Sequence, residues 1–409
     1  MATTASAVAV VVWRQGRLPE ARKLFEDALV VFREIGSRNG EARALNGIAN
    51  VLREEGNFDR AKAMYAEVLA IGREIGQKSF VATSLSNIAN VHEDQGDLAG
   101  AQKTNEEALA IAREIGEKNN VTRIMRNLAG VVGKQGELTR ARNLFEESLA
   151  MSREVGNKRN VARALSSLGD VLLHQGDLAG AVKRYQEALT VSREVGEKGD
   201  LAIISAQMGN VFLAQGKFVE ARRQHEEALA IRQEIGQKRI EPDSDLDLAR
   251  LSIEEGAFAD AERLARRAAD TFRAQKAVDG EASALVVVAE ALRAQSKLVD
   301  AGDTIERAVT LSRASQNRLV RIPVAITSAK LRGASRDPSA AAAAVRSLEA
   351  AVSETTTRGL IDLQLEARLV LGQLETAGSN PAAGRARLAA LEKEAAQKGF
   401  GLIAGKARN

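Results

Sequence analysis

Apolar residues recur along the chain at the spacing of amphipathic helices. Within residues 42–55 they stand at i, i+3, i+4 and i+7, and the stripe consists of Leu45, Ile48, Ala49 and Leu52. A second stripe follows in residues 59–75 and consists of Ala61, Met64, Tyr65, Val68 and Leu69. Gly56 follows the first stripe and Gly76 the second, where helix-ending residues are expected. The pattern predicts a pair of helices joined by a short turn.

This helix pair repeats with a period of 40 residues. Glycine stands at residues 16, 56, 96, 136, 176, 216 and 256, with Ser296 in the next place, and alanine stands five residues after each of them. A second glycine series occupies residues 36, 76, 116, 156, 196 and 236. Small residues also recur inside the first helix of each pair, where two helices must approach closely. Because a lone pair leaves one face uncovered, the pairs must stack side by side into a solenoid.

The pattern resembles the tetratricopeptide repeat family. The residues that carry the resemblance, with their copies every 40 residues, are Leu45, Ile48, Ala49, Gly56, Ala61, Tyr65, Val68 and Leu69. The family's usual period is about 34 residues, and here six residues are added around the segment Arg-Glu-Ile-Gly. The resemblance implies an all-α fold, an α-α superhelix of about ten helical hairpins. We expect eight 40-residue repeats in residues 1–320.

Residues 321–409 continue the pattern in weaker form. Pro323 is expected to open a helix that reaches about Leu331, and an Ala-rich helix should end near Gly359. One more pair is expected in residues 360–377 and 381–398, with residues 400–403 folding back as a C-terminal cap. We therefore expect two degenerate helical hairpins and a cap in residues 321–409. A separate four-helix domain is the alternative.

Composition and charge exclude several classes of protein. The chain has 409 residues with no cysteine and three histidines, so disulfide frameworks, Cys-ligated metals and thiol nucleophiles are excluded. The net charge of +4 is small for this length, and no basic stripe is visible that would bind nucleic acid. No apolar run is long enough for a transmembrane helix, and no signal peptide is evident. We expect a soluble, cytoplasmic protein.

No set of residues suitable for catalysis converges in the sequence. His92, His174 and His225 fall in three different repeats at three different positions, and His92 and His225 take places that hold large core residues in other copies. Adjacent glutamates such as Glu106 and Glu107 diverge on a helix and recur in several copies, as expected for a solvated face. Phosphate-binding glycine loops are absent. The sequence favours a protein that is not an enzyme and needs no cofactor or metal.

The remaining chemical signal is polar and follows the first helices of the pairs. The resemblance implies that these helices line the concave surface of the superhelix, where family members hold peptides or partner helices. Asparagine binds peptide backbone and arginine binds carboxylates, so we expect a protein or peptide in the concave groove. The candidate binding residues are Arg43, Asn46, Asn50, Asn87, Asn90, Arg123, Arg126, Asn127 and Arg163.

A more specific comparison concerns the carboxylate clamp of some family members, which is built from Lys, Asn, Asn, Lys and Arg. Asn50, Asn87 and Arg123 match two of the asparagines and one basic residue of that clamp. Asn46 stands in place of Lys, and Asn127 in place of Arg. The match predicts a polar peptide groove and does not extend to the clamp itself.

Two other functions stay open. The 40-residue unit resembles variants found in scaffold proteins, kinesin light chains and C-terminal regions of bacterial signalling regulators, so the chain could be a sensory or regulatory module of a longer protein. The valine-rich start of the chain, residues 8–12, is unusually apolar for a solenoid end. This feature allows a self-assembling structural protein that associates through its N-terminal helix.

Overall fold

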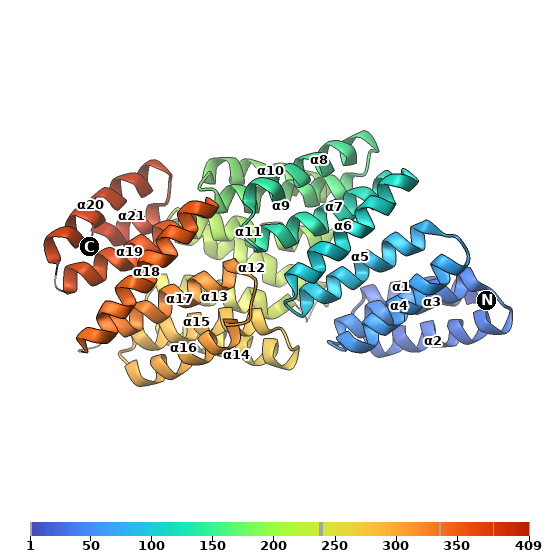
Figure 1. Cartoon of the computed structure of the whole chain (residues 1–409), viewed down its shortest axis with the longest axis horizontal. Coiled ribbons are helices and arrows are strands. Elements are labelled where there is room, and N and C mark those ends of the chain that lie inside the picture. Colours follow the sequence, from blue (N-terminus) through green and yellow to red (C-terminus); the bar gives the residue numbers. More distant parts are fainter. Residues whose placement is uncertain (1, 237–239, 335–336, 379, 409) are drawn as a thin grey trace.

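The computed structural model describes residues 2–236, 240–334, 337–378 and 380–408, and these ranges contain helices and no strand (Figure 1). None of the helices in them is both long and apolar enough to cross a membrane. The all-α fold is confirmed. The helices are α1 (Ala2–Arg14), α2 (Leu18–Glu34), α3 (Arg38–Glu54), α4 (Phe58–Glu74), α5 (Lys78–Asp94), α6 (Leu98–Ile115), α7 (Lys118–Lys134), α8 (Leu138–Glu154), α9 (Lys158–His174), α10 (Leu178–Val195), α11 (Lys198–Ala214), α12 (Phe218–Glu234), α13 (Glu241–Glu254), α14 (Phe258–Ala274), α15 (Val278–Ala294), α16 (Leu298–Ser312), α17 (Arg318–Gly333), α18 (Pro338–Arg358), α19 (Ile361–Ala377), α20 (Pro381–Gln397) and α21 (Gly401–Arg408).

Consecutive helices pair into hairpins, from α1 with α2 to α19 with α20, and α21 follows the last pair. The periodic glycines end these helices in the left-handed conformation, with φ of 74° at Gly56 and 68° at Gly76. Lys276 and Ser296 stand where the series lacks glycine, and they adopt the same conformation at φ of 57° and 62°. The turn geometry is therefore kept even where it costs a side chain about 1–2 kcal/mol.

Aspartates cap the second helix of two hairpins. Asp97 accepts a hydrogen bond from the backbone N–H of Gly100, and Asp177 accepts one from Gly180, both at 2.8 Å. Asn57 and Glu137 occupy the same place in their hairpins but make no such bond. Side-chain capping thus supports some of the helix starts, and hydrophobic packing positions the others.

Small residues allow the two helices of a hairpin to approach closely. Ala61 and its copies at 21, 101, 141, 181, 221, 261 and 301 are fully buried. Gly169 faces the ring of Tyr185, and a Cβ atom there would lie 2.4 Å from the ring. Since no pair of carbon atoms tolerates that distance, the glycine is required by the aromatic residue opposite to it.

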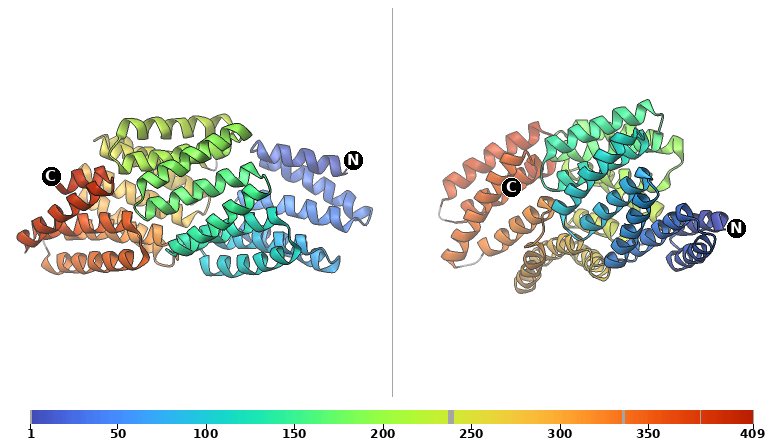
Figure 2. Two further views of the ribbon diagram at one scale, coloured as in Figure 1. Left: turned by 90° about the horizontal axis from the view of Figure 1, so that it is seen from above. Right: turned by 45° about the vertical axis from the view of Figure 1, so that its right-hand side comes forward.

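The hairpins stack side by side into a superhelix (Figure 2), and the contacts between consecutive odd-numbered helices place these helices on its inner side. Odd-numbered helices contact each other from one hairpin to the next, whereas their even-numbered partners diverge on the outside. Helices on the inner side of a curved solenoid line its concave surface. The predicted polar residues all lie on odd-numbered helices, from α3 to α9.

Distant hairpins also contact each other across the superhelix. Gln316 accepts a hydrogen bond from the backbone N–H of Ala99 at 2.7 Å, and Arg318 donates one to the backbone oxygen of Gln135 at 2.5 Å. His174 Nδ1 lies 2.8 Å from Asp362 Oδ2. These residues are 217, 183 and 188 positions apart in the sequence. One turn of the superhelix therefore rests on the next after about five hairpins.

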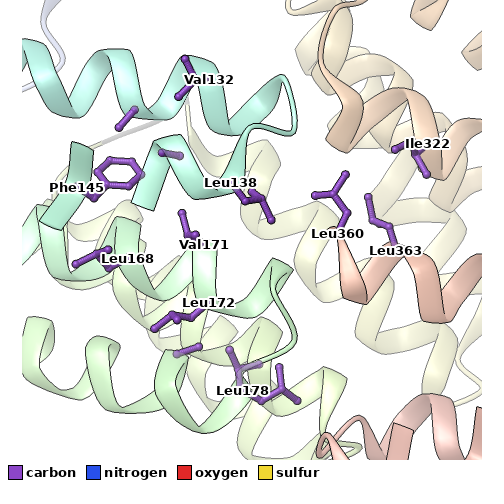
Figure 3. Close-up of a cluster of buried hydrophobic side chains, with 14 of the residues drawn as sticks. Val132, Leu138, Phe145, Leu168, Val171, Leu172, Leu178, Ile322, Leu360 and Leu363 are labelled. Atoms are coloured by element: carbon purple, nitrogen blue, oxygen red, sulfur yellow. The ribbon is translucent and has the colours of Figure 1, made fainter. Parts of the chain in front are cut away.

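The C-terminal hairpins share a core with the middle of the chain. Leu360 and Leu363 belong to the same buried cluster as Leu138 and Leu178, and Leu360 faces Leu138 in Figure 3. Phe400, just before α21, is also buried in this cluster. The superhelix is therefore closed on itself by apolar contacts as well as by polar ones.

Helix α17 differs from the prediction at its start. It begins at Arg318, and Pro323 lies inside the helix instead of opening it. Asn317 caps the helix by accepting a hydrogen bond from the backbone N–H of Leu319 at 3.1 Å. Because a proline within the first two turns removes only one helical hydrogen bond, the cap at Asn317 decides where the helix begins.

The contact of His174 with Asp362 should make stability depend on pH. Burial disfavours the charged imidazole, but the neighbouring carboxylate of Asp362 outweighs burial and raises the pKa of His174. A pKa raised in the folded state stabilises the fold fully below the unfolded value of about 6.5, and this contribution disappears as pH rises through the raised value. We expect Asp362→Asn to destabilise the protein by about 1–2 kcal/mol at pH 5.5 and by less at pH 9 in urea denaturation.

The control is Asp59→Asn, which changes an exposed carboxylate on α4. It should shift the urea midpoint little at either pH. Equal destabilisation by Asp362→Asn at both pH values would show that the charge of His174 does not stabilise the contact.

Candidate functional site

The odd-numbered helices present a row of amide side chains to the inside of the superhelix. Asn87 on α5 donates a hydrogen bond from Nδ2 to Asn46 Oδ1 on α3 at 2.8 Å. Asn127 on α7 donates one to Asn90 Oδ1 on α5 at 3.1 Å. We call Asn46, Asn87, Asn90 and Asn127 the amide row. Each bond joins one hairpin to the next, so the row contributes to the stacking as well as to the surface.

Two tyrosines support the same inner surface from the second helix of their hairpins. The hydroxyl of Tyr65 donates to Asn50 Oδ1 at 2.6 Å, and that of Tyr185 donates to Asp170 Oδ1 at 2.7 Å. Burial raises the pKa of Asp170 to about 6, against the effect of the tyrosine bond. Gln207 donates to the other oxygen of Asp170 at 2.7 Å. Asn50 is thus held within its own hairpin and not in the amide row.

The four predicted arginines have different surroundings. Arg43 is exposed at the start of α3 and forms no hydrogen bond among the described residues. Arg123 donates to Asn120 Oδ1 at 2.6 Å and to Ser86 Oγ at 3.3 Å. Arg163 donates from Nε to both carboxylate oxygens of Asp200, at 3.0 and 3.1 Å.

Arg126, on the same face of α7 as Arg123, has no hydrogen-bond partner for its buried Nε. Burial, together with the charges of Arg163 and Arg123, lowers the pKa of Arg126 to about 10. The structure thus brings Arg123, Arg126 and Arg163 together and leaves Arg43 apart from them.

The side chains at the three matching clamp positions are engaged within the chain. Asn50 is held by Tyr65, Asn87 by Asn46, and Arg123 by Asn120 and Ser86. The amides that replace the two missing cations are themselves members of the amide row. The inner surface at this place is therefore an internally bonded polar wall.

Acidic residues on the inner side were not among the predicted site residues. Asp243 stands 40 residues after Ile203 and 80 after Arg163; its side chain is exposed, but desolvation by the protein around it raises its pKa to about 6. Burial also raises the pKa of Asp247 and of Glu366. Aligning the repeats position by position would have found these residues, because Asp243 and Asp247 continue the columns of Arg163 and Gln207.

A pocket of about 560 Å³ opens beside Arg123. It lies where α7 and α9 begin, and the backbone N–H groups of those helix starts make it suitable for acceptor or anionic groups. Asn157 donates a hydrogen bond to Asn119 across it at 2.8 Å. The residues that line the pocket are Gly116, Glu117, Lys118, Asn119, Asn120, Arg123, Asn157 and Asn160.

The histidines do not form a catalytic group with one another. His92 Nδ1 lies 2.8 Å from Asp97 Oδ2, and His174 contacts Asp362. His225 is buried beneath α11 at 1% exposure, and neither of its ring nitrogens has a hydrogen-bond partner. Burial lowers the pKa of His225 to about 4, so this core residue is neutral. Among the described residues, no group of three or more His, Asp or Glu is arranged to hold a metal ion.

His225 takes the place that Tyr65 and Tyr185 hold in other hairpins, and Asn210 stands where their partners Asn50 and Asp170 stand. Gly209 leaves the same space beside it as Gly169 leaves for Tyr185. We expect His225→Tyr to stabilise the protein by about 1–2 kcal/mol in urea denaturation, because the hydroxyl can donate to Asn210. His225→Phe is the control without that hydroxyl. Equal stability of the two variants would contradict the proposed hydrogen bond.

The chain matches a family model described as tetratricopeptide repeat over three consecutive segments. They span residues 1–74, 80–154 and 160–234 and together cover more than half of the chain. Each segment contains two of the hairpins described above. No curated protein matches the chain.

Three solved structures share the fold at low sequence identity. A Rap protein complexed with competence and sporulation factor is 13% identical, with a TM-score of 0.59 over 88% of this chain and 99% of that one. The Rap conjugation gene regulator of the plasmid pLS20, in complex with the Phr* peptide, is 13% identical, with a TM-score of 0.58 over 67% and 74%. Aspartyl phosphate phosphatase F from Bacillus subtilis is 12% identical, with a TM-score of 0.54 over 72% and 76%.

Proposed function

The chain belongs to the tetratricopeptide repeat family, and we propose that it is a non-enzymatic scaffold that binds a protein or peptide along the inner side of its superhelix. The single observation that carries the proposal is the amide row, continued by the arginines of α7 and α9. A polar wall of this kind, built on the first helices of consecutive hairpins, suits the capture of an extended chain. We assign the groove to Arg43, Asn46, Asn50, Asn87, Asn90, Arg123, Arg126, Asn127 and Arg163.

The amide row can bind a peptide without losing the bonds that hold the hairpins together. Each asparagine side chain has two N–H donors and a carbonyl oxygen with two lone pairs. Asn87 uses one donor toward Asn46, and Asn127 uses its donors toward Asn90 and Ser86. The remaining donors and lone pairs can bond to peptide groups. The row is pre-organised, which reduces the entropy lost on binding.

The structures with the same fold support a peptide as partner. Two of them were solved with a bound ligand, the Phr* peptide in one and competence and sporulation factor in the other. One of these proteins is a conjugation gene regulator. A regulatory role for this chain, in which peptide binding controls a signalling protein in the cytoplasm, is a further part of the proposal.

A bulky residue in the groove should block binding. Gly130 on α7 stands in the column of Asn90 and Asp170, and a Cβ atom on it would meet nothing within 4 Å. We therefore expect Gly130→Trp to fold normally and to obstruct the groove. The matched control is Gly302→Trp on α16, an even-numbered outer helix, where a Cβ atom also meets nothing within 4 Å.

The measurement is affinity capture from the native cell extract, quantified by mass spectrometry for the original chain and both variants. Partners of the groove should be retained by Gly302→Trp and reduced at least tenfold by Gly130→Trp. Circular dichroism and thermal melting check that both variants are folded. Equal capture by the two variants would place binding outside the inner surface.

Self-association through α1 is a second candidate, favoured by exposed valines. Val8 and Val11 are 47% and 55% exposed, whereas the copies 40 residues later, Ile48 and Val51, are 5% and 0% exposed. In later hairpins this face is covered by the preceding hairpin. A second copy of the chain could cover Val8 and Val11 through a two-fold symmetric contact of the two α1 helices.

Cysteine cross-linking tests this candidate cleanly, because the chain has no cysteine of its own. We expect Val8→Cys to form a covalent dimer under mild oxidation, since a two-fold axis that passes beside Val8, in the middle of α1, brings both copies of residue 8 together. Val299→Cys is the control, because Val299 is 78% exposed on α16, far from α1 in the sequence. Cross-linking of both variants to the same extent, or of neither, would contradict a specific contact through α1.

A further inference from the structure

Arg126 differs from the residues that occupy its place in the neighbouring hairpins. The positions 40 residues before and after it hold Ser86 and Ser166, and Ala206 follows. All three are buried, at 0%, 5% and 5% exposure. A long cationic side chain therefore stands on the inner wall where the copies at 86, 166 and 206 have a small neutral residue; further copies of this position, Asn46, Leu246 and Val286, are neutral as well. Packing does not require an arginine at this place.

The charge of Arg126 is not balanced by its surroundings. Its Nε is buried without an acceptor, and it forms no ion pair with any residue that the structure describes. The two acids with the strongest influence on it are bound elsewhere, since Asp200 accepts from Arg163 and Glu93 accepts from Lys134 at 2.7 Å. The nearest cations, Arg123 and Arg163, add to the positive charge.

An unpaired, partly buried cation is unfavourable, and it is stabilised by an anion that brings acceptor oxygens to it. The guanidinium group offers a planar pair of N–H donors, which matches a carboxylate with two parallel hydrogen bonds. The amide row lies on both sides of this point, with Asn90 on α5 and Asn127 next to Arg126 on α7. Peptide backbone can bond to these amides while a carboxylate reaches Arg126.

We propose that Arg126 is the specificity-determining residue of the groove and binds a carboxylate of an extended acidic peptide segment, with Arg123 and Arg163 beside it. This assignment rests on the proposed peptide-binding function and names the chemical class of the ligand. It differs from the clamp arrangement, because the residues at the matching clamp positions are bonded to other residues of the chain. Arg126, whose guanidinium has no ion-pair partner among the described residues, lies one helical turn further along α7 than Arg123.

The test uses two fluorescent peptides, hexaglutamate and hexaglutamine, which differ in charge but little in shape. Binding is measured by fluorescence polarisation at 50 mM salt. We expect the unaltered chain to bind hexaglutamate at least tenfold more tightly than hexaglutamine. Arg126→Ser restores the residue of the neighbouring repeats and should abolish this preference. Arg60→Ser removes an exposed arginine on the outer helix α4 and should retain it.

Thermal melting of the same variants separates a binding role from a structural one. Arg126→Ser without peptide should melt at or above the temperature of the unaltered chain, because an unbalanced charge is removed. A clear fall in its melting temperature would assign Arg126 to the fold and overturn the proposal. Persistence of the hexaglutamate preference in Arg126→Ser would overturn it as well.

Inorganic phosphate distinguishes a peptide carboxylate from a free anion. At equal ionic strength, phosphate should displace hexaglutamate no better than chloride does. Specific displacement by phosphate would assign the site to a free anion and overturn the peptide carboxylate. The proposed groove is tested separately from Arg126. If a partner is lost from Gly130→Trp but still captured by Arg126→Ser, the groove remains the binding site and only the assignment of a carboxylate to Arg126 is overturned.

Discussion

The packing of each hairpin against the preceding one is the interaction on which the rest of the structure depends. Val51, Val91 and Val131 occupy the same place in three successive hairpins, and all are fully buried. Burial of one such side chain contributes roughly 1.5–3 kcal/mol, and every interface contains several of them. Because the interface is nearly the same each time, each hairpin is rotated by a similar angle relative to the last. The curvature, and with it the inner wall, follows from this repeated contact.

The helix ends could be predicted from the sequence almost to the residue, because the periodic glycines mark them, whereas α3 begins at Arg38, four residues before the predicted start. The predicted helix in residues 59–75 corresponds to Phe58–Glu74, and the glycines occupy the expected turns. The contacts between successive turns of the superhelix could not be predicted. The bonds of Ala99 to Gln316 and of His174 to Asp362 depend on a rotation that accumulates over about five hairpins. A small error in each step would move these residues far apart.

The candidate site was predicted less completely than the fold. The positions of Asn46, Asn87 and Asn127 on the first helices follow from the repeat, and the structure brings their side chains to one surface. Their bonds to one another could not be foreseen, since the gap between two hairpins decides whether one amide reaches the next. The unpaired state of Arg126 has the same origin. Arg126 is unpaired because Asp200 bonds to Arg163 and not to Arg126, and the sequence does not specify which arginine the carboxylate reaches.

An inner wall that satisfies most of its own hydrogen bonds limits how a partner can be recognised. Amides already bonded to each other, as in the amide row, give a rigid surface with spare donors and acceptors but little discrimination between sequences. Discrimination must then come from positions that break the repeat, because only there does the wall differ from one hairpin to the next. Such positions are found by comparing equivalent residues in successive repeats. Arg126 stands between copies of the repeat that have Ser86 and Ser166 at this position, and packing does not need its charge. Because this charge has no partner within the chain, it says more about the ligand than the amide row, whose side chains are bonded to one another.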